Sequence, residues 1–256
     1  MPFIIFMKDS KKTETKEVVI NLDTFAIPLA IVIAGVIIAL GIFFANRNKT
    51  TSDATNNNND TATTEDDDTF PSATTNIGTG AVLGNKDTAK VAIVMYSDYQ
   101  CPYCQKFEED TLADIRSNYV DSGNVIFVFR NFPLSFHGDI TYQSAYAGEC
   151  VYDQLGAEKL AEFHAQAYLA ESMDAVNTVA KSLGVNEAKY NTCLSTQEFK
   201  SRVDDDFAAG QAAGVSGTPG FVVGTLDADG NVTGKLIEGA YPYDSFKAVI
   251  DEMLAK

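Results

Sequence analysis

Two cysteines, separated by two residues and set between a strand-like run and a helix-like segment, constrain this 256-residue chain more than any other feature. Residues 91–96 are rich in β-branched and aromatic side chains, which is typical of a buried strand. After the cysteines, apolar residues recur every three to five positions among acidic ones, which predicts an amphipathic helix over residues 104–119. A thiolate at a helix N-terminus is stabilised by the helix dipole and by unpaired backbone N–H groups. Cys101-Pro102-Tyr103-Cys104 is therefore predicted to be a redox-active dithiol.

The position of each cysteine in the helix predicts its role. Cys101 is expected at the exposed helix start as the sulfur that attacks or is attacked, and Cys104, one turn further in, is expected to resolve the mixed disulfide. A Cys-X-X-Cys pair is also half of a four-cysteine zinc site, but such sites usually contain two close pairs. The chain has only two further cysteines, which are far apart, and its two histidines are not at ligand spacing. We therefore expect no metal site, and no cofactor other than the redox-active disulfide.

A second motif lies far downstream. Residues 214–220 read Gly-Val-Ser-Gly-Thr-Pro-Gly and precede a strand-like run, which could be an ordinary Gly/Pro loop. Together with Ser-Asp-Tyr-Gln-Cys-Pro-Tyr-Cys at 97–104, however, this motif resembles the thioredoxin superfamily and, within it, the DsbA-like thiol-disulfide oxidoreductases. The resemblance extends from about residue 82 to the C-terminus. It implies that Pro219 is a cis-proline facing the dithiol and that the Thr218 backbone pairs with a bound substrate chain.

The chain also departs from this family's pattern. Thioredoxin has a buried carboxylate six residues before its first active cysteine, whereas this chain has Met95 there. Asp98 is nearer and could assist proton transfer, but we expect it to be a solvated or helix-capping acid. The best-known bacterial oxidants have Pro-His between the cysteines, and this chain has Pro-Tyr. A missing histidine donor would make the pair a milder oxidant, so the direction of electron flow is inferred from the compartment.

The other two cysteines, Cys150 and Cys193, lie between residues 139 and 214, a segment whose pattern predicts a helical insertion into the fold. Unpaired thiols are a liability in an exported domain, and some members of the family have a second disulfide in this region. The resemblance therefore implies a structural disulfide, which would contribute roughly 4 kcal/mol in the chain-entropy model. Two buried thiols, or a second redox pair, are the alternatives.

The N-terminal part of the chain indicates the compartment. Residues 25–45 carry no charge and are long enough to cross the roughly 30 Å core of a bilayer as a helix, which favours an uncleaved transmembrane signal anchor over a cleaved signal peptide. More basic residues precede this segment than follow it closely, so residues 1–24 are predicted to be cytoplasmic and the rest extracytoplasmic. Residues 46–80 are rich in Thr, Asn and Asp and are predicted to be a disordered acidic linker.

The remaining residues, 81–256, are long enough for one globular domain. The pattern predicts an α/β fold: a thioredoxin fold whose βαβ unit has strands at 91–96 and 125–131, with an all-helical insertion over about 139–214. A hairpin of 221–223 and 234–238 and a last helix over 242–254 follow. The net charge of −16 argues against a nucleic-acid partner.

These observations predict a membrane-anchored protein disulfide oxidoreductase, an oxidase acting on unfolded or reduced exported proteins through Cys101 and Cys104. The resemblance implies re-oxidation by a quinone-linked membrane oxidoreductase of the DsbB or vitamin-K-epoxide-reductase type. Two alternatives remain open: a disulfide isomerase or reductase, and a non-catalytic binding or chaperone module that keeps the thioredoxin scaffold.

Overall fold

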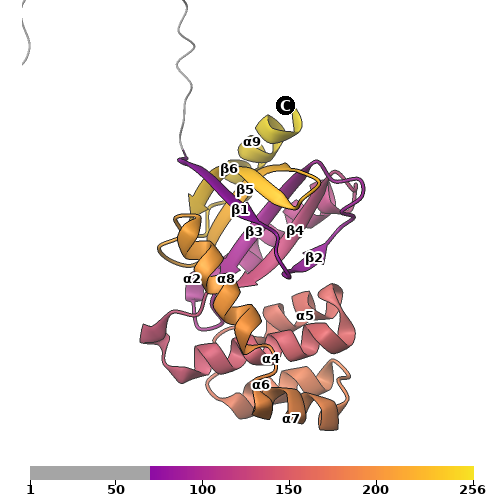
Figure 1. Ribbon diagram of the computed structural model, residues 1–256, viewed down its shortest axis with the longest axis vertical. Helices are drawn as coiled ribbons and strands as arrows, with labels where there is room; N and C mark the ends of the chain where they lie inside the picture. Colours follow the sequence, from indigo (N-terminus) through magenta and orange to yellow (C-terminus); the bar gives the residue numbers. More distant parts are fainter. Residues whose placement is uncertain (1–69) are drawn as a thin grey trace, which may run out of the picture. The chain divides into compact units, whose positions relative to one another are not determined.

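The computed structural model describes residues 70–256 (Figure 1). The predicted cytoplasmic tail at 1–24, the predicted anchor at 25–45 and the linker up to residue 69 lie outside the described residues. Among residues 70–256, none of the helices combines the length and the apolar composition that a membrane span requires.

A six-stranded sheet forms the centre of the domain, in the order β1-β6-β5-β3-β4-β2. Its strands are β1 (Ser72–Asn76), β2 (Ala81–Leu83), β3 (Val91–Ser97), β4 (Val125–Asn131), β5 (Gly220–Leu226) and β6 (Asn231–Glu238). β3 runs parallel to β4, with Val91 opposite Val125 and Ser97 opposite Asn131, and every other neighbouring pair is antiparallel. All seven residues of β3 and of β4 are buried, as expected for strands covered on both faces.

The helical segments follow the motif and fill the predicted insertion. A continuous helical stretch after the first cysteine consists of α2 (Pro102–Phe107), the π-helical turn η1 (Glu108–Leu112), α3 (Ala113–Ile115) and the second π-helical turn η2 (Arg116–Val120). The short η3 (Ser135–His137) precedes the insertion, which contains α4 (Asp139–Leu155), α5 (Ala157–Ala167), α6 (Met173–Ser182), α7 (Glu187–Thr196) and α8 (Lys200–Ala212). The last helix, α9 (Tyr243–Leu254), ends the domain.

Apolar side chains bury both faces of the sheet. On one face, aromatic rings from α2, β4, β5 and α9 pack together, with Phe107 in contact with Phe127, Phe221 and Phe246 at centroid distances of 4.5–6.2 Å. α8 covers the other face, where its Phe207 ring stacks on the ring of Phe132, the residue directly after β4. Figure 1 shows α4 to α7 gathered at one end of the sheet, with α8 leading from this group back across it. The predicted α/β fold with a helical insertion is confirmed.

The start of the domain differs from the prediction. Residues 46–80 were expected to form a disordered linker, but residues 72–76 form β1, which pairs antiparallel with β6. This strand is polar and buries only alternate residues, Ala73 and Thr75, so it lacks the apolar run that marks a buried strand. Backbone pairing with β6 and a hydrogen bond between the Thr75 and Tyr96 hydroxyls, 2.6 Å apart, hold it in place.

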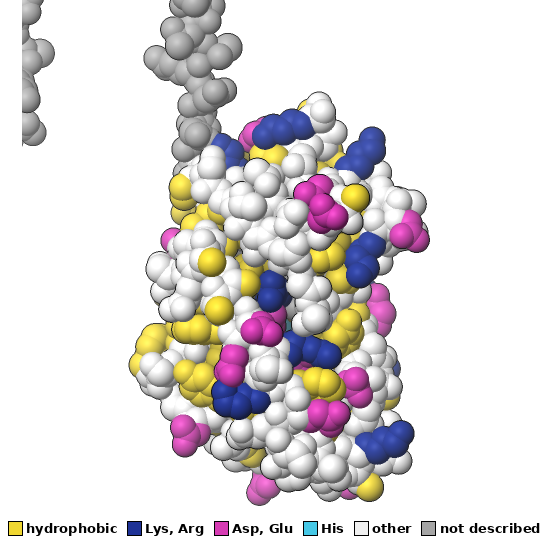
Figure 2. All heavy atoms as spheres, viewed as in Figure 1, with side chains coloured by type: hydrophobic (Ala, Val, Ile, Leu, Met, Phe, Trp, Pro, Cys, Tyr) yellow, Lys and Arg dark blue, Asp and Glu magenta, His cyan; other side chains and the backbone are white. Residues whose placement is uncertain are grey.

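The surface of the domain mixes charges of both signs. On the face drawn in Figure 2, Lys and Arg side chains are interspersed with Asp and Glu, and apolar patches lie between them. The fold therefore presents apolar surface among charges on this side, without separating the two signs into blocks.

Candidate active site

The two motif cysteines lie at the start of the helix that follows the central strand. Cys101 is the N-cap residue of α2, Pro102 is the first helical residue, and both cysteines are free thiols. Cys104 is fully buried, and Cys101 exposes only 4% of its surface, so the expectation of an exposed Cys101 is wrong. The reason is tertiary: the loop before β5 packs over the thiol.

That loop carries the second motif. The Thr218–Pro219 peptide bond is cis, and the Cys101 thiol donates a hydrogen bond to the Thr218 carbonyl oxygen at 3.2 Å. These two residues are 117 positions apart in the chain. The antiparallel pairing of β5 with β3 brings them together, because β5 begins immediately after the cis-proline.

The two thiols differ strongly in acidity. The hydrogen bond from the Cys104 side chain contributes most to lowering the pKa of Cys101 to about 6, and the Thr218 side chain adds to this. The backbone N–H groups of Cys104 and Tyr103 also lower this pKa, as expected at a helix N-terminus, while burial opposes them. Burial raises the pKa of Cys104 well above its ordinary value, and Cys101 raises it further. The site therefore contains one stabilised thiolate beside one buried thiol.

Asp98 is the first residue of the short loop that joins β3 to the dithiol. It is 1% exposed, and no side chain caps the start of α2, so the expectation of a solvated or helix-capping acid is wrong. Its carboxylate accepts hydrogen bonds from the backbone N–H groups of Gln100 and Leu134, each at 2.7 Å, and from the Thr141 hydroxyl. His137 Nδ1 lies 2.8 Å from the same carboxylate. Asp98 therefore ties the active-site loop to the loop after β4 and to the first turn of α4, and no local sequence signal indicates this.

Glu108, one turn after Cys104, is a second acidic residue that the periodic pattern placed on a polar helix face. Its Oε2 atom is buried and has no hydrogen-bond partner among residues 70–256. Burial raises the pKa of this carboxyl to about 8, and the Arg116 guanidinium only partly offsets that shift. Glu108 is therefore largely protonated at neutral pH and adds little negative charge near the dithiol.

An apolar groove opens beside the dithiol. It has a volume of about 360 Å³ and lies between the cis-proline loop, α2 and the segment that joins β6 to α9. Tyr103 and Tyr241 line it and are 63% and 42% exposed. Pro102 starts the helix and Tyr103 faces this groove, so the two middle residues of the motif contribute helix initiation and apolar surface.

The second pair of cysteines forms a disulfide. Cys150 of α4 is bonded to Cys193 of α7 within the helical insertion. No group of three or more His, Cys, Asp or Glu side chains in residues 70–256 is arranged to hold a metal ion.

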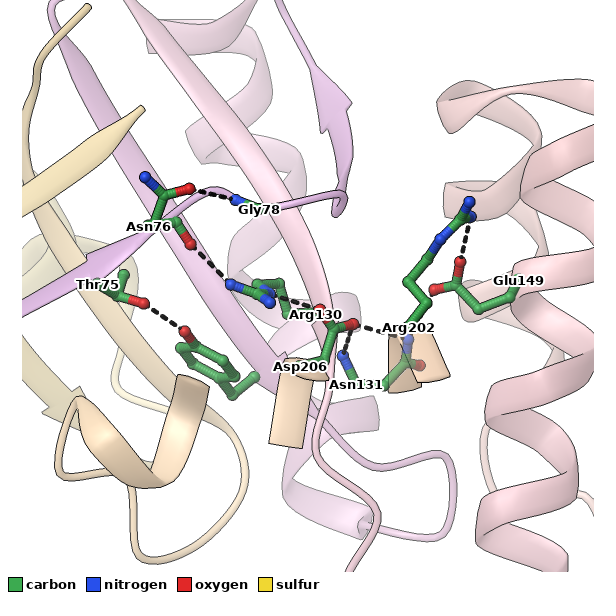
Figure 3. Close-up of polar contacts among 9 residues, drawn as sticks. Thr75, Asn76, Gly78, Arg130, Asn131, Glu149, Arg202 and Asp206 are labelled. Atoms are coloured by element: carbon green, nitrogen blue, oxygen red, sulfur yellow. Dashed lines mark hydrogen bonds and ion pairs between the residues drawn. The ribbon is translucent and has the colours of Figure 1, made fainter. Parts of the chain in front are cut away.

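A buried polar network joins the sheet to the insertion (Figure 3). Arg130 at the end of β4 donates to Asp206 of α8 at 2.6 Å and to the Asn76 carbonyl of β1 at 2.7 Å. Asn131 donates from its backbone to Asp206 at 2.9 Å and from its side chain to Glu149 of α4 at 2.7 Å. This network holds the edge strand β1 and the helices α4 and α8 to the end of β4.

The sequence comparisons with known proteins point to one family. Residues 75–252 match a family model described as thioredoxin. The chain is 28% identical to the probable disulfide bond formation protein D of Bacillus anthracis, over 67% of this chain and 77% of that protein. It is 29% identical to disulfide bond formation protein D of Bacillus subtilis, over 68% of this chain and 76% of that protein.

Solved structures agree with the sequence comparison. Oxidised BdbD from Bacillus subtilis is similar with a TM-score of 0.62 and 26% identity, over 73% of this chain and 99% of BdbD. Wolbachia pipientis α-DsbA1 has the same fold, with a TM-score of 0.58 and 18% identity, over 69% of this chain and 92% of that protein. With a free dithiol at a helix N-terminus facing a cis-proline, the chain belongs to the thioredoxin family and is a DsbA-like protein thiol-disulfide oxidoreductase.

Proposed function

We propose that this chain is an oxidase that donates disulfides to exported proteins on the extracytoplasmic side of a membrane. The unequal acidity of the two thiols carries the proposal: the pKa of Cys101 is lowered to about 6, whereas that of Cys104 is raised. Stabilising a thiolate stabilises the reduced form of the pair, which makes the corresponding disulfide more oxidising.

The reaction is a two-step exchange. A substrate thiolate attacks Cys101 of the Cys101–Cys104 disulfide, a bond forms between the substrate sulfur and Cys101, and Cys104 leaves and takes up a proton. A second substrate thiolate then attacks the substrate sulfur of this mixed disulfide, and Cys101 leaves as the stabilised thiolate. The substrate loses two electrons and gains one disulfide, and the chain retains the two electrons as its dithiol.

The groove beside the dithiol suits an unfolded chain as substrate. Exposed aromatic rings at Tyr103 and Tyr241 offer apolar contact without selecting a particular side chain. In this proposal the Thr218 backbone pairs with an extended segment of the substrate, and its contact with the Cys101 thiol supports that role.

The compartment and the partner that restores the disulfide belong to the same proposal. Residues 25–45 anchor the chain in the membrane with residues 1–24 in the cytoplasm, and a quinone-linked membrane oxidoreductase accepts the electrons from the dithiol. Membrane fractionation and protease accessibility of the full-length chain test the anchor. Deletion of residues 25–45 should move the chain to the soluble fraction, and a full-length chain found in that fraction would contradict the anchor.

The reduction potential tests the direction. The full-length chain is equilibrated in glutathione buffers, and the fraction of Cys101–Cys104 disulfide is measured by alkylation. A potential well above that of glutathione, toward the roughly −120 mV of a strong oxidant, is expected. A value near the roughly −270 mV of thioredoxin would favour the reductase alternative.

Oxidative refolding of a reduced protein tests the catalytic step. The oxidised wild-type chain should accelerate it, and Cys101→Ser should abolish the acceleration. A non-catalytic binding module would instead retain its whole effect on refolding in the Cys101→Ala, Cys104→Ala double variant.

A further inference from the structure

Tyr241 lies between two hollows in the surface of the domain. It lines the apolar groove beside the dithiol, together with Tyr103 and Thr218. It also lines a second hollow of about 340 Å³, whose other walls come from Phe70, β6 and α9. Of these two hollows Phe70 lines only the second, so it is not itself part of the groove. The position of the Tyr241 ring therefore determines the shape of one groove wall.

The Phe70 ring packs against Tyr241 from the side of the second hollow. The two ring centroids are 5.3 Å apart and the ring planes meet at 85°, an edge-to-face contact. Aromatic pairs prefer this arrangement at such distances. The Tyr241 backbone is fixed, because its N–H donates to the Gly239 carbonyl at 2.9 Å and its carbonyl accepts from the Thr111 hydroxyl at 3.3 Å. The ring is 42% exposed, and packing against Phe70 restricts its rotation.

The pairing of β1 with β6 places Phe70 at this position. The Pro71 carbonyl accepts a hydrogen bond from the Leu236 N–H at 2.8 Å, and Ser72 is the first residue of β1 to pair with β6. β6 ends at Glu238, three residues before Tyr241. Phe70 also packs against the large apolar core. The polar edge strand β1 thus holds an aromatic ring next to the groove wall.

We propose that Phe70 is a positioning residue for substrate binding: its ring keeps Tyr241 in the wall of the groove that receives an unfolded protein substrate. Without the Phe70 ring, the second hollow enlarges and the Tyr241 ring is free to rotate away from the groove. A substrate chain must then order that ring when it binds, which lowers its affinity. The inference rests on the role of the groove as the substrate site under the proposed function. It concerns protein substrates only, because a small dithiol does not need the groove.

Phe70→Leu is the direct test, because it removes the ring and keeps an apolar side chain. The oxidised full-length chain is mixed with reduced, unfolded ribonuclease A or with dithiothreitol, and loss of the Cys101–Cys104 disulfide is followed by acid quenching and alkylation. The second-order rate constant with ribonuclease A should fall about twofold to tenfold, which corresponds to the strength of one aromatic pair. The rate constant with dithiothreitol should stay unchanged. Equal decreases with both would overturn the proposal, because they would place the effect at the dithiol.

Phe199→Leu is the matched control. Phe199, directly before α8, is half-buried as Phe70 is and packs against the same core, but it lines neither hollow. This variant should leave both rate constants unchanged. A decrease equal to that of Phe70→Leu would mean that loosening of the core, and not the contact with Tyr241, slows the reaction. If Phe70→Leu does not fold, Phe70→Met decides by the same two rate constants, since it also lacks the ring.

Tyr241→Ala distinguishes failure of this inference from failure of the proposed substrate site. It should lower the rate constant with ribonuclease A at least as much as Phe70→Leu, and adding Phe70→Leu to it should lower the rate constant no further. Additive effects would overturn the role of Phe70, as would a decrease in Tyr241→Ala without one in Phe70→Leu. An unchanged rate constant in Tyr241→Ala would show that the groove is not the substrate site and would overturn both.

Discussion

The Cys104 side chain and backbone N–H groups of the same helix turn lower the pKa of Cys101, whereas Cys104 is enclosed by the core. We predict that the alkylation rate of reduced Cys101 by iodoacetamide rises with pH with a midpoint of about 6, because only the thiolate reacts. Cys104→Ala should move this midpoint upward, because it removes the largest single contribution to the lowered pKa. A midpoint near that of a free thiol, about 8.5, would contradict the stabilised thiolate.

The same titration affects the stability of the reduced chain. The pKa of Cys101 is lower in the folded than in the unfolded state, so the unfolded chain binds more protons between the two values. The stabilisation is fully present above the pKa of the unfolded thiol and is lost as the pH falls through about 6. Urea denaturation of the reduced chain should therefore show a loss of stability from pH 8.5 to pH 5.5 relative to the oxidised chain, in which neither cysteine titrates.

Among the elements, α8 is held to β4 by a charged contact that the core encloses. Asp206 accepts from Arg130 at 2.6 Å and from the Asn131 backbone at 2.9 Å. Asp206→Ala would leave the Arg130 guanidinium buried without its carboxylate, which typically costs about 3–5 kcal/mol. We expect a decrease of that size in the free energy of unfolding, measured by urea denaturation.

The neighbouring residue on the same helix provides the control for that experiment. Asp205 is exposed, so Asp205→Ala should change the free energy of unfolding by less than about 0.5 kcal/mol while removing the same charge. Equal effects of the two substitutions would mean that net charge, and not the buried contact, determines the stability of the α8 packing.

For the domain as a whole, the disulfide between α4 and α7 restricts the unfolded chain. It joins residues 43 positions apart, and a closed loop of this length stabilises a fold by about 4 kcal/mol in the chain-entropy model. The Cys150→Ala, Cys193→Ala double variant should lose about 2–4 kcal/mol of unfolding free energy while its Cys101 alkylation midpoint stays unchanged. A shifted midpoint would instead show that this disulfide is coupled to the active dithiol.

Patterns within short segments are sufficient for the central elements of the fold, but not for its edge strand β1. The helix after the dithiol follows from apolar periodicity, which reflects burial along one element. The buried strand before it and the helical insertion follow from the residue types that each segment favours. β1 was missed because its polar sequence is held by pairing with β6 and by the Arg130 contact to its last carbonyl. Edge strands of this kind depend on a partner strand and not on their own composition.

The sequence by itself determined that two cysteines lie one turn apart at a helix start, because that spacing is a local property of the chain. Only the tertiary structure decided that the Thr218 carbonyl contacts the Cys101 thiol and that Asp98 is buried. It also placed Tyr168 against Ser97, 71 residues away. Contacts between such distant segments depend on how the sheet and the insertion pack together, and no local pattern of residues encodes that packing.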